Sequence, residues 1–117
     1  ARHARRALSM ASGPARAALR VGVVGASGYS GAVAARLVAG HPDLRLVFAT
    51  SDKLAGKSVA DELAVRGVGS MAYAPNASAE ELAGEVDAVL LATAAEVSAR
   101  LAPRFVEAKT IVIDLSG

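Results

Sequence analysis

Hydrophobic residues in this chain fall into two alternating patterns, and the alternation predicts the fold. Short, continuous apolar runs rich in Val, Leu and Ile are typical of strands buried on both faces; they occupy 20–25, 44–50, 87–93 and 110–117. Segments with apolar residues at helical spacing lie between them and predict helices at 30–40, 58–67, 78–84 and 95–108. Since alternating strands and helices build parallel sheets, we expect an α/β, Rossmann-type doubly wound parallel sheet.

Several local signals refine these elements. Gly40, followed by Pro42, predicts the end of the first helix. Ser78 with Glu81 three residues later has the spacing of a capping box and predicts a helix that starts at Ser78. Pro103 falls inside the last helix, where we expect a kink or a break. Residues 68–77 are ambiguous, with a short strand at 71–74 as one reading.

The most informative stretch is "VGVVGASGYSG", in which a strand breaks into glycines at Gly25, Gly28 and Gly31. Between a strand and a helix, such a series predicts a turn at Gly25, close approach of a diphosphate at Gly28 and close packing at Gly31. Main-chain amides between residues 25 and 31, together with the helix N-terminus, would hold the phosphates. The plainer alternative is a glycine-rich turn that binds nothing. A Walker-type loop is disfavoured because no Lys-Ser/Thr pair follows Gly31.

The end of the second strand bears on which nucleotide is bound. Ser51 and Lys53 could hold a 2′-phosphate, which favours NADP over NAD. Asp52 argues the other way unless its carboxylate is turned aside. Lys53 and Lys57 could equally be ordinary solvated loop charges.

Charge is distributed unevenly along the chain. The net charge is +2, yet the first 20 residues hold five arginines and no acid, which leaves the remainder with eight basic and eleven acidic residues. The rest of the chain therefore lacks the basic, aromatic-interleaved surface of a nucleic-acid binder. With no cysteine, disulfides and thiolate metal sites are excluded within these residues. No apolar run reaches the roughly 18 residues that span a bilayer, so we expect no membrane segment.

Residues 1–19 are rich in Ala, Arg and Ser, which is the composition of a transit peptide. Upstream coding sequence before Met10, or an unrelated remnant, is the plainer alternative. We expect this arm to be disordered or loosely helical and the dinucleotide-binding domain to begin at residue 20. A cytoplasmic location is expected, or a chloroplast or mitochondrion if the arm is a targeting signal.

Five markers in order, "VGVVGASGYSG", "HPDLRLVFATSD" with "AGK", "DAVLLAT", "EVSARLAP" and "VIDLSG", resemble the semialdehyde dehydrogenase family over residues 20–117. Within it, the chain is most similar to the N-acetyl-γ-glutamyl-phosphate reductases of arginine biosynthesis. The resemblance implies reduction of an acyl phosphate to an aldehyde with NADPH. It also implies cofactor contacts at Ser27, Gly28, Tyr29, Ser30, Gly31 and Ser51 and, near the nicotinamide, in the loop at Thr93. That loop departs from the family, since Thr93-Ala94-Ala95-Glu96 stands where many members carry Pro-His or Pro-Asn.

The family mechanism implies a cysteine nucleophile and a histidine acid/base in a later catalytic α+β domain. This chain has no cysteine; His3 lies in the arm, and His41 is expected to be a solvent-facing capping residue. We therefore expect these residues to bind NADP without a catalytic residue or a metal. The full-length protein would act on a small-molecule acyl phosphate, as a homo-oligomer, without nucleic acid or membrane. An aspartate-semialdehyde dehydrogenase domain and a non-catalytic nucleotide-sensing module remain alternatives.

Overall fold

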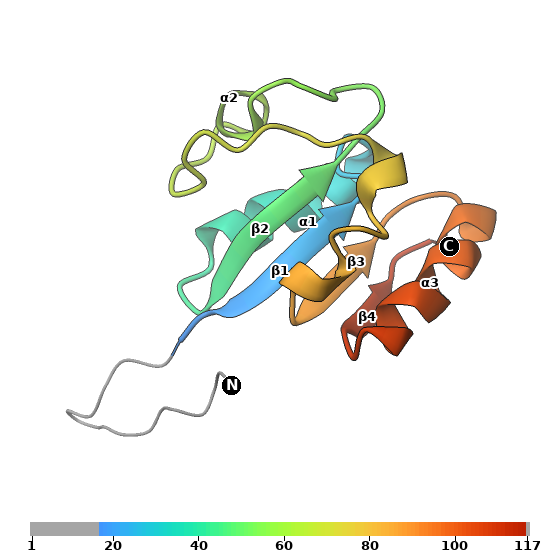
Figure 1. The fold of residues 1–117 in the computed structure, drawn as a ribbon. Helices are drawn as coiled ribbons and strands as arrows, with labels where there is room; N and C mark the ends of the chain where they lie inside the picture. Colours follow the sequence, from blue (N-terminus) through green and yellow to red (C-terminus); the bar gives the residue numbers. More distant parts are fainter. Residues whose placement is uncertain (1–16, 117) are drawn as a thin grey trace.

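A computed structural model describes residues 17–116 of the chain (Figure 1). The expectations of a disordered or targeting arm fall almost entirely on residues 1–16, which lie outside the described residues, as does Gly117. The first strand begins at Leu19, whose N–H donates to the Asp43 carbonyl at 3.0 Å. The first strand therefore starts one residue before the apolar run predicted at 20–25.

Four parallel strands form one sheet in the order β2-β1-β3-β4. They are β1 (Leu19–Val24), β2 (Leu44–Thr50), β3 (Ala88–Leu91) and β4 (Ile111–Asp114). The chain goes from β1 outward to β2 and then returns to the other side of β1 for β3. This reversal creates a switch point at the carboxyl ends of β1 and β3, the place where ligands bind in open α/β sheets.

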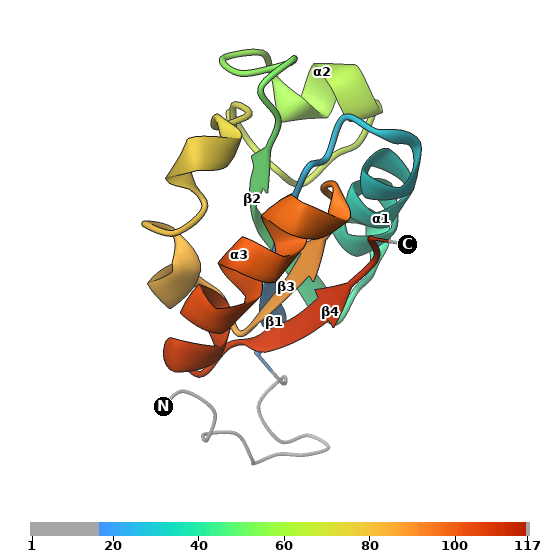
Figure 2. The same ribbon diagram turned by 90° about the vertical axis from the view of Figure 1, so that its right-hand side faces the viewer.

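Helices cover both faces of the sheet, and Figure 2 shows α1 (Tyr29–Gly40) on one side and α3 (Ala95–Glu107) on the other. Because side chains alternate along a buried strand, the core divides into two clusters. One contains Val23, Ala35 and Leu63 beneath α1 and α2 (Val59–Leu63), and the other contains Val89 and Phe105 beneath α3. The doubly wound parallel sheet predicted from the sequence is confirmed.

The absence of a side chain at Gly22 leaves room for the ring of Phe48 to pack against β1. A Cβ at Gly22 would overlap the ring of Phe48, so a larger residue there would displace that ring. The β1–β2 register shifts at the same point, with Val21 opposite Leu46 and Gly22 opposite Phe48. The bulge turns Phe48 into the cluster on the α3 side.

The helix predicted for 78–84 is wrong. The segment forms 3₁₀ turns at Asn76–Ser78 and Ala83–Glu85, and Ser78 ends the first turn instead of capping a helix. Most of the backbone hydrogen bonds in this region join residues three apart. Ala79 and Ala83 are the buried residues of the segment. Its Ala, Glu and Leu residues favour a helix, but so little packing surface and the nearby Gly84 do not stabilise an extended one.

Three other features of the chain differ from those predicted from the sequence. Helix α2 ends at Leu63 because Ala64 adopts a left-handed conformation (φ 56°), so Gly67 is not its end. Residues 71–74 form isolated bridges, Ser58 with Ala72 and Thr50 with Ala74, in place of a strand. Helix α3 continues through Pro103 without a break. Pro103 and Ala99, whose carbonyl would face the missing N–H, are both exposed, so water can replace that hydrogen bond.

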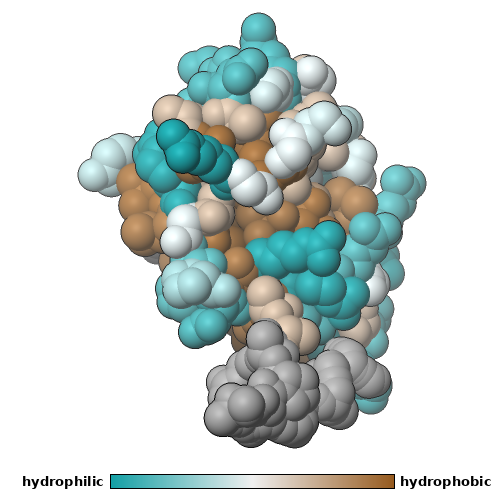
Figure 3. All heavy atoms as spheres, turned by 90° about the vertical axis from the view of Figure 1, so that its left-hand side faces the viewer, coloured by the Kyte–Doolittle hydropathy of each residue, from teal (hydrophilic) through white to brown (hydrophobic). Residues whose placement is uncertain are grey.

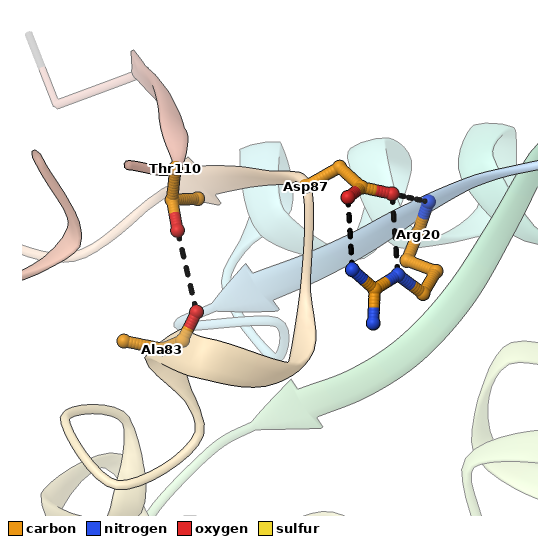
Figure 4. A network of polar contacts seen from close by, with 4 residues as sticks. All are labelled: Arg20, Ala83, Asp87 and Thr110. Carbon is orange, nitrogen blue, oxygen red and sulfur yellow. Dashed lines mark hydrogen bonds and ion pairs between the residues drawn. The ribbon is translucent and has the colours of Figure 1, made fainter. Parts of the chain in front are cut away.

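A polar network joins the amino ends of the strands (Figure 4). The Asp87 carboxylate accepts hydrogen bonds from the Arg20 backbone N–H at 2.9 Å, Nη2 at 2.9 Å and Nε at 3.2 Å. The hydrogen bond with Asp87 raises the pKa of Arg20. Beside this pair, the buried Thr110 hydroxyl donates to the Ala83 carbonyl at 3.2 Å. These contacts fasten β1, β3 and the start of β4 at the end of the sheet opposite the glycine loop.

Apolar side chains also reach the surface. Leu37 on α1 and Ile111 on β4 are more than half exposed, at 69% and 58%. A view from the left-hand side of Figure 1 shows apolar residues across the middle of the molecule, interrupted by hydrophilic ones, below a hydrophilic upper end (Figure 3). In the part of the chain that the structure describes, no helix is long and apolar enough to cross a membrane.

Candidate functional site

The glycine loop lies at the carboxyl ends of β1 and β3. Gly25 has a φ of +82°, which favours glycine, and a Cβ there would lie 2.8 Å from both the Ala92 carbonyl oxygen and Thr93 Cγ2. The turn thus brings two of the predicted site residues, Gly25 and Thr93, into contact. Since each follows a different strand, only the parallel sheet makes them neighbours.

Gly31 fixes how closely α1 approaches the loop. A Cβ at Gly31 would overlap the Gly25 carbonyl oxygen and lie 2.9–3.0 Å from neighbouring main-chain atoms. The predicted role of Gly31, close packing of helix on strand, therefore agrees with the geometry.

Gly28 occupies the open mouth of the loop. It is the N-cap of α1, with extended backbone angles (φ −74°, ψ 173°), and a Cβ there would find no protein atom within 4 Å. No side chain caps the helix and no acid lies in its first turn. The first hydrogen bond back to the loop joins Ala32 N–H to the Gly28 carbonyl, so the amides before it have no helical partner. An uncapped, exposed helix N-terminus of this kind is suited to a diphosphate.

Contacts with Thr50 reduce the number of main-chain amides in the glycine loop that remain free to bind a ligand. Its carbonyl accepts the N–H groups of Gly25 at 3.1 Å and Ala26 at 2.8 Å, and its hydroxyl oxygen also lies 3.2 Å from the Gly25 nitrogen. The expectation that all the amides from residue 25 to 31 face a ligand is therefore wrong for the first two. The amides that remain belong to Ser27, Gly28, Tyr29, Ser30 and Gly31. Ser27, Tyr29 and Ser30 are exposed, and Tyr29 is 89% exposed.

Thr93 is held from the side of α3. Its hydroxyl lies 2.9 Å from the Ser98 hydroxyl, and Ser98 is fully buried. This contact orients the half-buried Thr93 just after β3, beside Gly25 of the glycine loop.

Asp52 and Lys53, which follow β2, line two different hollows. Lys53 and Ser27 line one of about 320 Å³, and Asp52 lines another of about 390 Å³ beside α3. The Asp52 carboxylate accepts the Asn76 N–H at 2.8 Å. The acid that argued against NADP is thus turned away from Lys53.

Ser51 is placed differently from the other predicted contacts. It is only 1% exposed, and its hydroxyl oxygen accepts the Leu54 N–H at 3.0 Å. Its side chain therefore shapes the turn that carries Lys53, while a direct contact with a phosphate stays a prediction.

Two residues that sequence reasoning missed belong to the same region. Arg36 lines the Lys53 hollow, and its Nε donates to the Leu63 carbonyl at 3.1 Å. Asn76 accepts the Thr50 hydroxyl at 2.8 Å through Oδ1. Arg36 lies five residues after Gly31, and this short spacing could have been noticed in the sequence. Asn76 has no such sequence signal, because only tertiary contacts bring it to this region. His41, by contrast, is an exposed C-cap residue as expected.

Within residues 17–116, no group of three or more His, Cys, Asp or Glu side chains is placed to hold a metal ion.

The parallel sheet, its switch point and the uncapped glycine loop define a Rossmann-type dinucleotide-binding domain. Residues 20–117 match the semialdehyde dehydrogenase, NAD binding domain family, and the chain belongs to that family.

Curated relatives give a more particular likeness. The chain is 41% identical over 100 residues to an N-acetyl-gamma-glutamyl-phosphate reductase of Brevibacillus brevis, covering 85% of this chain and 29% of the relative. It is 40% identical over 99 residues to the enzyme of that name from Escherichia coli, covering 81% and 30%. The chain thus spans under a third of the length of these relatives.

Solved structures agree on the fold. A probable aspartate-semialdehyde dehydrogenase from Pseudomonas aeruginosa superposes with a TM-score of 0.62 at 30% identity, over 86% of this chain and 28% of the other. The Candida albicans aspartate semialdehyde dehydrogenase with NADP gives 0.63 at 21% identity, over 86% and 30%. At that identity the second likeness concerns the fold alone.

Proposed function

We propose that this chain is the NADP-binding domain of an N-acetyl-γ-glutamyl-phosphate reductase, which reduces N-acetyl-glutamyl 5-phosphate to the semialdehyde in arginine biosynthesis. The observation that carries the proposal is the open, uncapped start of α1 at Gly28. The relatives at about 40% identity that carry this reductase name support the particular assignment.

Each part of the site has a role in this proposal. The amides of residues 27–31 bind the diphosphate, and the partial positive charge of the α1 N-terminus stabilises it. Thr93 borders the nicotinamide half from the end of β3. The bound coenzyme would supply a hydride. The chain's own residues bind and orient the coenzyme.

NADP is preferred over NAD because of the charges on α1 and on the loop after β2. Lys53 and Arg36 share one hollow with Ser27, and Asp52 lies in another. A 2′-phosphate on the Lys53 side would therefore meet cations before it meets that acid. Ser51 supports the turn and keeps Lys53 in position.

We assign no catalytic residue to this chain. A thiolate nucleophile would have to come from outside these 117 residues, which contain no cysteine. The acyl-phosphate substrate, assembly as a homo-oligomer and a cytoplasmic location are proposals for the full-length protein.

The second candidate is an aspartate-semialdehyde dehydrogenase, which would use the same coenzyme on a different acyl phosphate. The Pseudomonas aeruginosa structure at 30% identity favours it. The reductase is preferred because its relatives are about 40% identical. A sensing module without catalysis would bind coenzyme through the same loop.

The direct test is the thermal stability of the chain with NADPH and with NADH, since a ligand that binds the native state raises its melting temperature. We expect a larger rise with NADPH. Gly28→Val should abolish both rises by placing a branched side chain at the mouth of the cradle. Gly40→Val is the matched control, because Gly40 also faces open space but lies at the other end of α1. Full protection of the Gly28→Val variant would contradict the proposal.

A further inference from the structure

Tyr73 carries a buried hydroxyl without a partner. The residue is 2% exposed, and among the residues that the structure describes its Oη has no hydrogen-bond partner. Buried polar groups are nearly always paired, because an unpaired one loses its hydration without compensation. Tyr73 is also one of the residues that line a hollow, so its unpaired, buried hydroxyl indicates a ligand atom as the missing partner.

Backbone hydrogen bonds fix the position of Tyr73. Tyr73 N–H donates to the Lys57 carbonyl at 2.9 Å, and its own carbonyl accepts the Gly56 N–H at 2.8 Å. Bridges at Ala72 and Ala74 hold the residues on both sides. Tyr73 is thus fastened to the loop that carries Lys53, with its ring in the cluster beneath α1 and α2.

The hollow that Tyr73 lines has a particular charge. Arg36 and Lys53 contribute two cations and Glu62 one acid, with Ser27 at the edge of the glycine loop. The Arg36 Nε donates to the Leu63 carbonyl, which anchors the guanidinium and leaves its other N–H groups for another acceptor. Guanidinium, ammonium and hydroxyl donors around one space are suited to a phosphate monoester.

Burial, and then the nearby Glu62 carboxylate, raise the pKa of Tyr73, while Arg36 lowers it. The phenol therefore remains protonated at neutral pH and acts as a donor.

We infer that Tyr73 and Arg36 are specificity-determining residues, whose hydroxyl and guanidinium bind the 2′-phosphate of the coenzyme opposite Lys53. The inference rests on the proposed function and adds two residues to it. Glu62 opposes the phosphate but is outnumbered by the two cations.

The test compares the 117-residue chain with Tyr73→Phe and Arg36→Met for affinity toward NADPH and NADH. Tyr73→Phe removes a single oxygen and should lower NADPH affinity roughly tenfold, or about 1.4 kcal/mol, as expected for a hydrogen bond to a charged group. NADH affinity should stay unchanged. Arg36→Met should likewise weaken NADPH selectively, by tenfold or more. Arg45→Met is the control, since Arg45 is exposed near the start of β2 and does not line the hollow.

A readout without ligand separates binding from structure. If the Tyr73 hydroxyl has no partner in the free protein, Tyr73→Phe leaves its melting temperature unchanged or raised. Adenosine 2′,5′-bisphosphate should reproduce the selective loss seen with NADPH, because it carries the same phosphate.

Each contrary result has a distinct meaning. An unchanged NADPH-to-NADH ratio in Tyr73→Phe and Arg36→Met would overturn the inference and leave the proposed function standing. A variant that melts lower and loses both coenzymes equally would show a structural role and also overturn it. A wild-type chain that binds neither coenzyme would overturn the proposed function and the inference together.

Discussion

The missing side chain of Gly31 leaves room for the carbonyl oxygen of Gly25, six residues earlier in the same loop. The two residues lie on opposite sides of the turn, at the end of β1 and in the first turn of α1. Their contact sets how closely the start of α1 approaches the end of β1. Close packing thus requires a glycine at position 31, whereas Gly28 faces open space and is the glycine proposed to admit a phosphate.

Gly31→Ala should destabilise the fold. The added methyl meets main-chain atoms, which cannot move aside like a flexible side chain, so we expect a loss of about 2–3 kcal/mol in the free energy of unfolding. Denaturant titration measures the loss. Gly40→Ala, at the far end of α1 with open space around it, should leave stability unchanged or raise it by up to about 1 kcal/mol. Equal effects at the two positions would contradict the role given to Gly31.

Lys53→Met should weaken NADPH binding about fivefold, because an exposed cation contributes roughly 1 kcal/mol to an ionic contact. NADH binding should change little, and the difference should shrink as salt is added. Calorimetry at two ionic strengths measures both. Lys57→Met is the control, since Lys57 is exposed in the same loop but does not line the hollow. If Lys57→Met has the larger effect, the 2′-phosphate lies elsewhere.

Asp87→Asn should lower the free energy of unfolding by about 1–2 kcal/mol, because its carboxylate accepts three hydrogen bonds from Arg20. The measurement is again denaturant titration. Glu80→Gln provides the comparison. Glu80 pairs with Arg104 at 3.1 Å with both side chains about half exposed, so its loss should cost under about 0.5 kcal/mol. A larger cost at Glu80 would contradict this ranking.

Ser116→Ala should raise the pKa of Asp114 toward its ordinary value. The Ser116 hydroxyl, and then its backbone N–H, stabilise the Asp114 carboxylate and lower that pKa. A lowered pKa stabilises the native state above the unfolded value of 3.8, and this contribution is lost as the pH falls through the folded value. NMR titration of the side-chain carboxyl carbon reports the change. Ser70→Ala, elsewhere on the surface, should leave it unmoved, and an unchanged pKa in Ser116→Ala would exclude the hydroxyl as the cause.

The strands and the two long helices could be predicted because their patterns are strong and local. Each of the four apolar runs overlaps one strand, and α1 begins within one residue of its predicted start. Ser78 and Pro103 show where local signals fail. No α-helix follows the capping box at Ser78, because the residues after Ser78 bury too little apolar surface to stabilise one. Pro103 is accommodated because the affected turn of α3 faces solvent.

The glycine part of the site was readable for the same reason, since Gly25, Gly28 and Gly31 lie within one turn. The role of Thr50 was not, because its contacts join residues about 25 positions apart. Nor could the sequence place Asp52 and Lys53 in different hollows, since adjacent residues in a loop can face opposite ways. Tyr73 lies in a segment without periodicity, and only its backbone contacts bring it to the site.

Thr50 ties the first amides of the glycine loop to one side and Asn76 to the other. One small side chain thereby fixes the start of the glycine loop to the end of β2, while Arg36, Lys53 and Tyr73 line a separate hollow beside it. If the proposed site is right, coenzyme choice in this scaffold is modular: the residues proposed to face the ribose could be exchanged without remaking the loop proposed to bind the diphosphate.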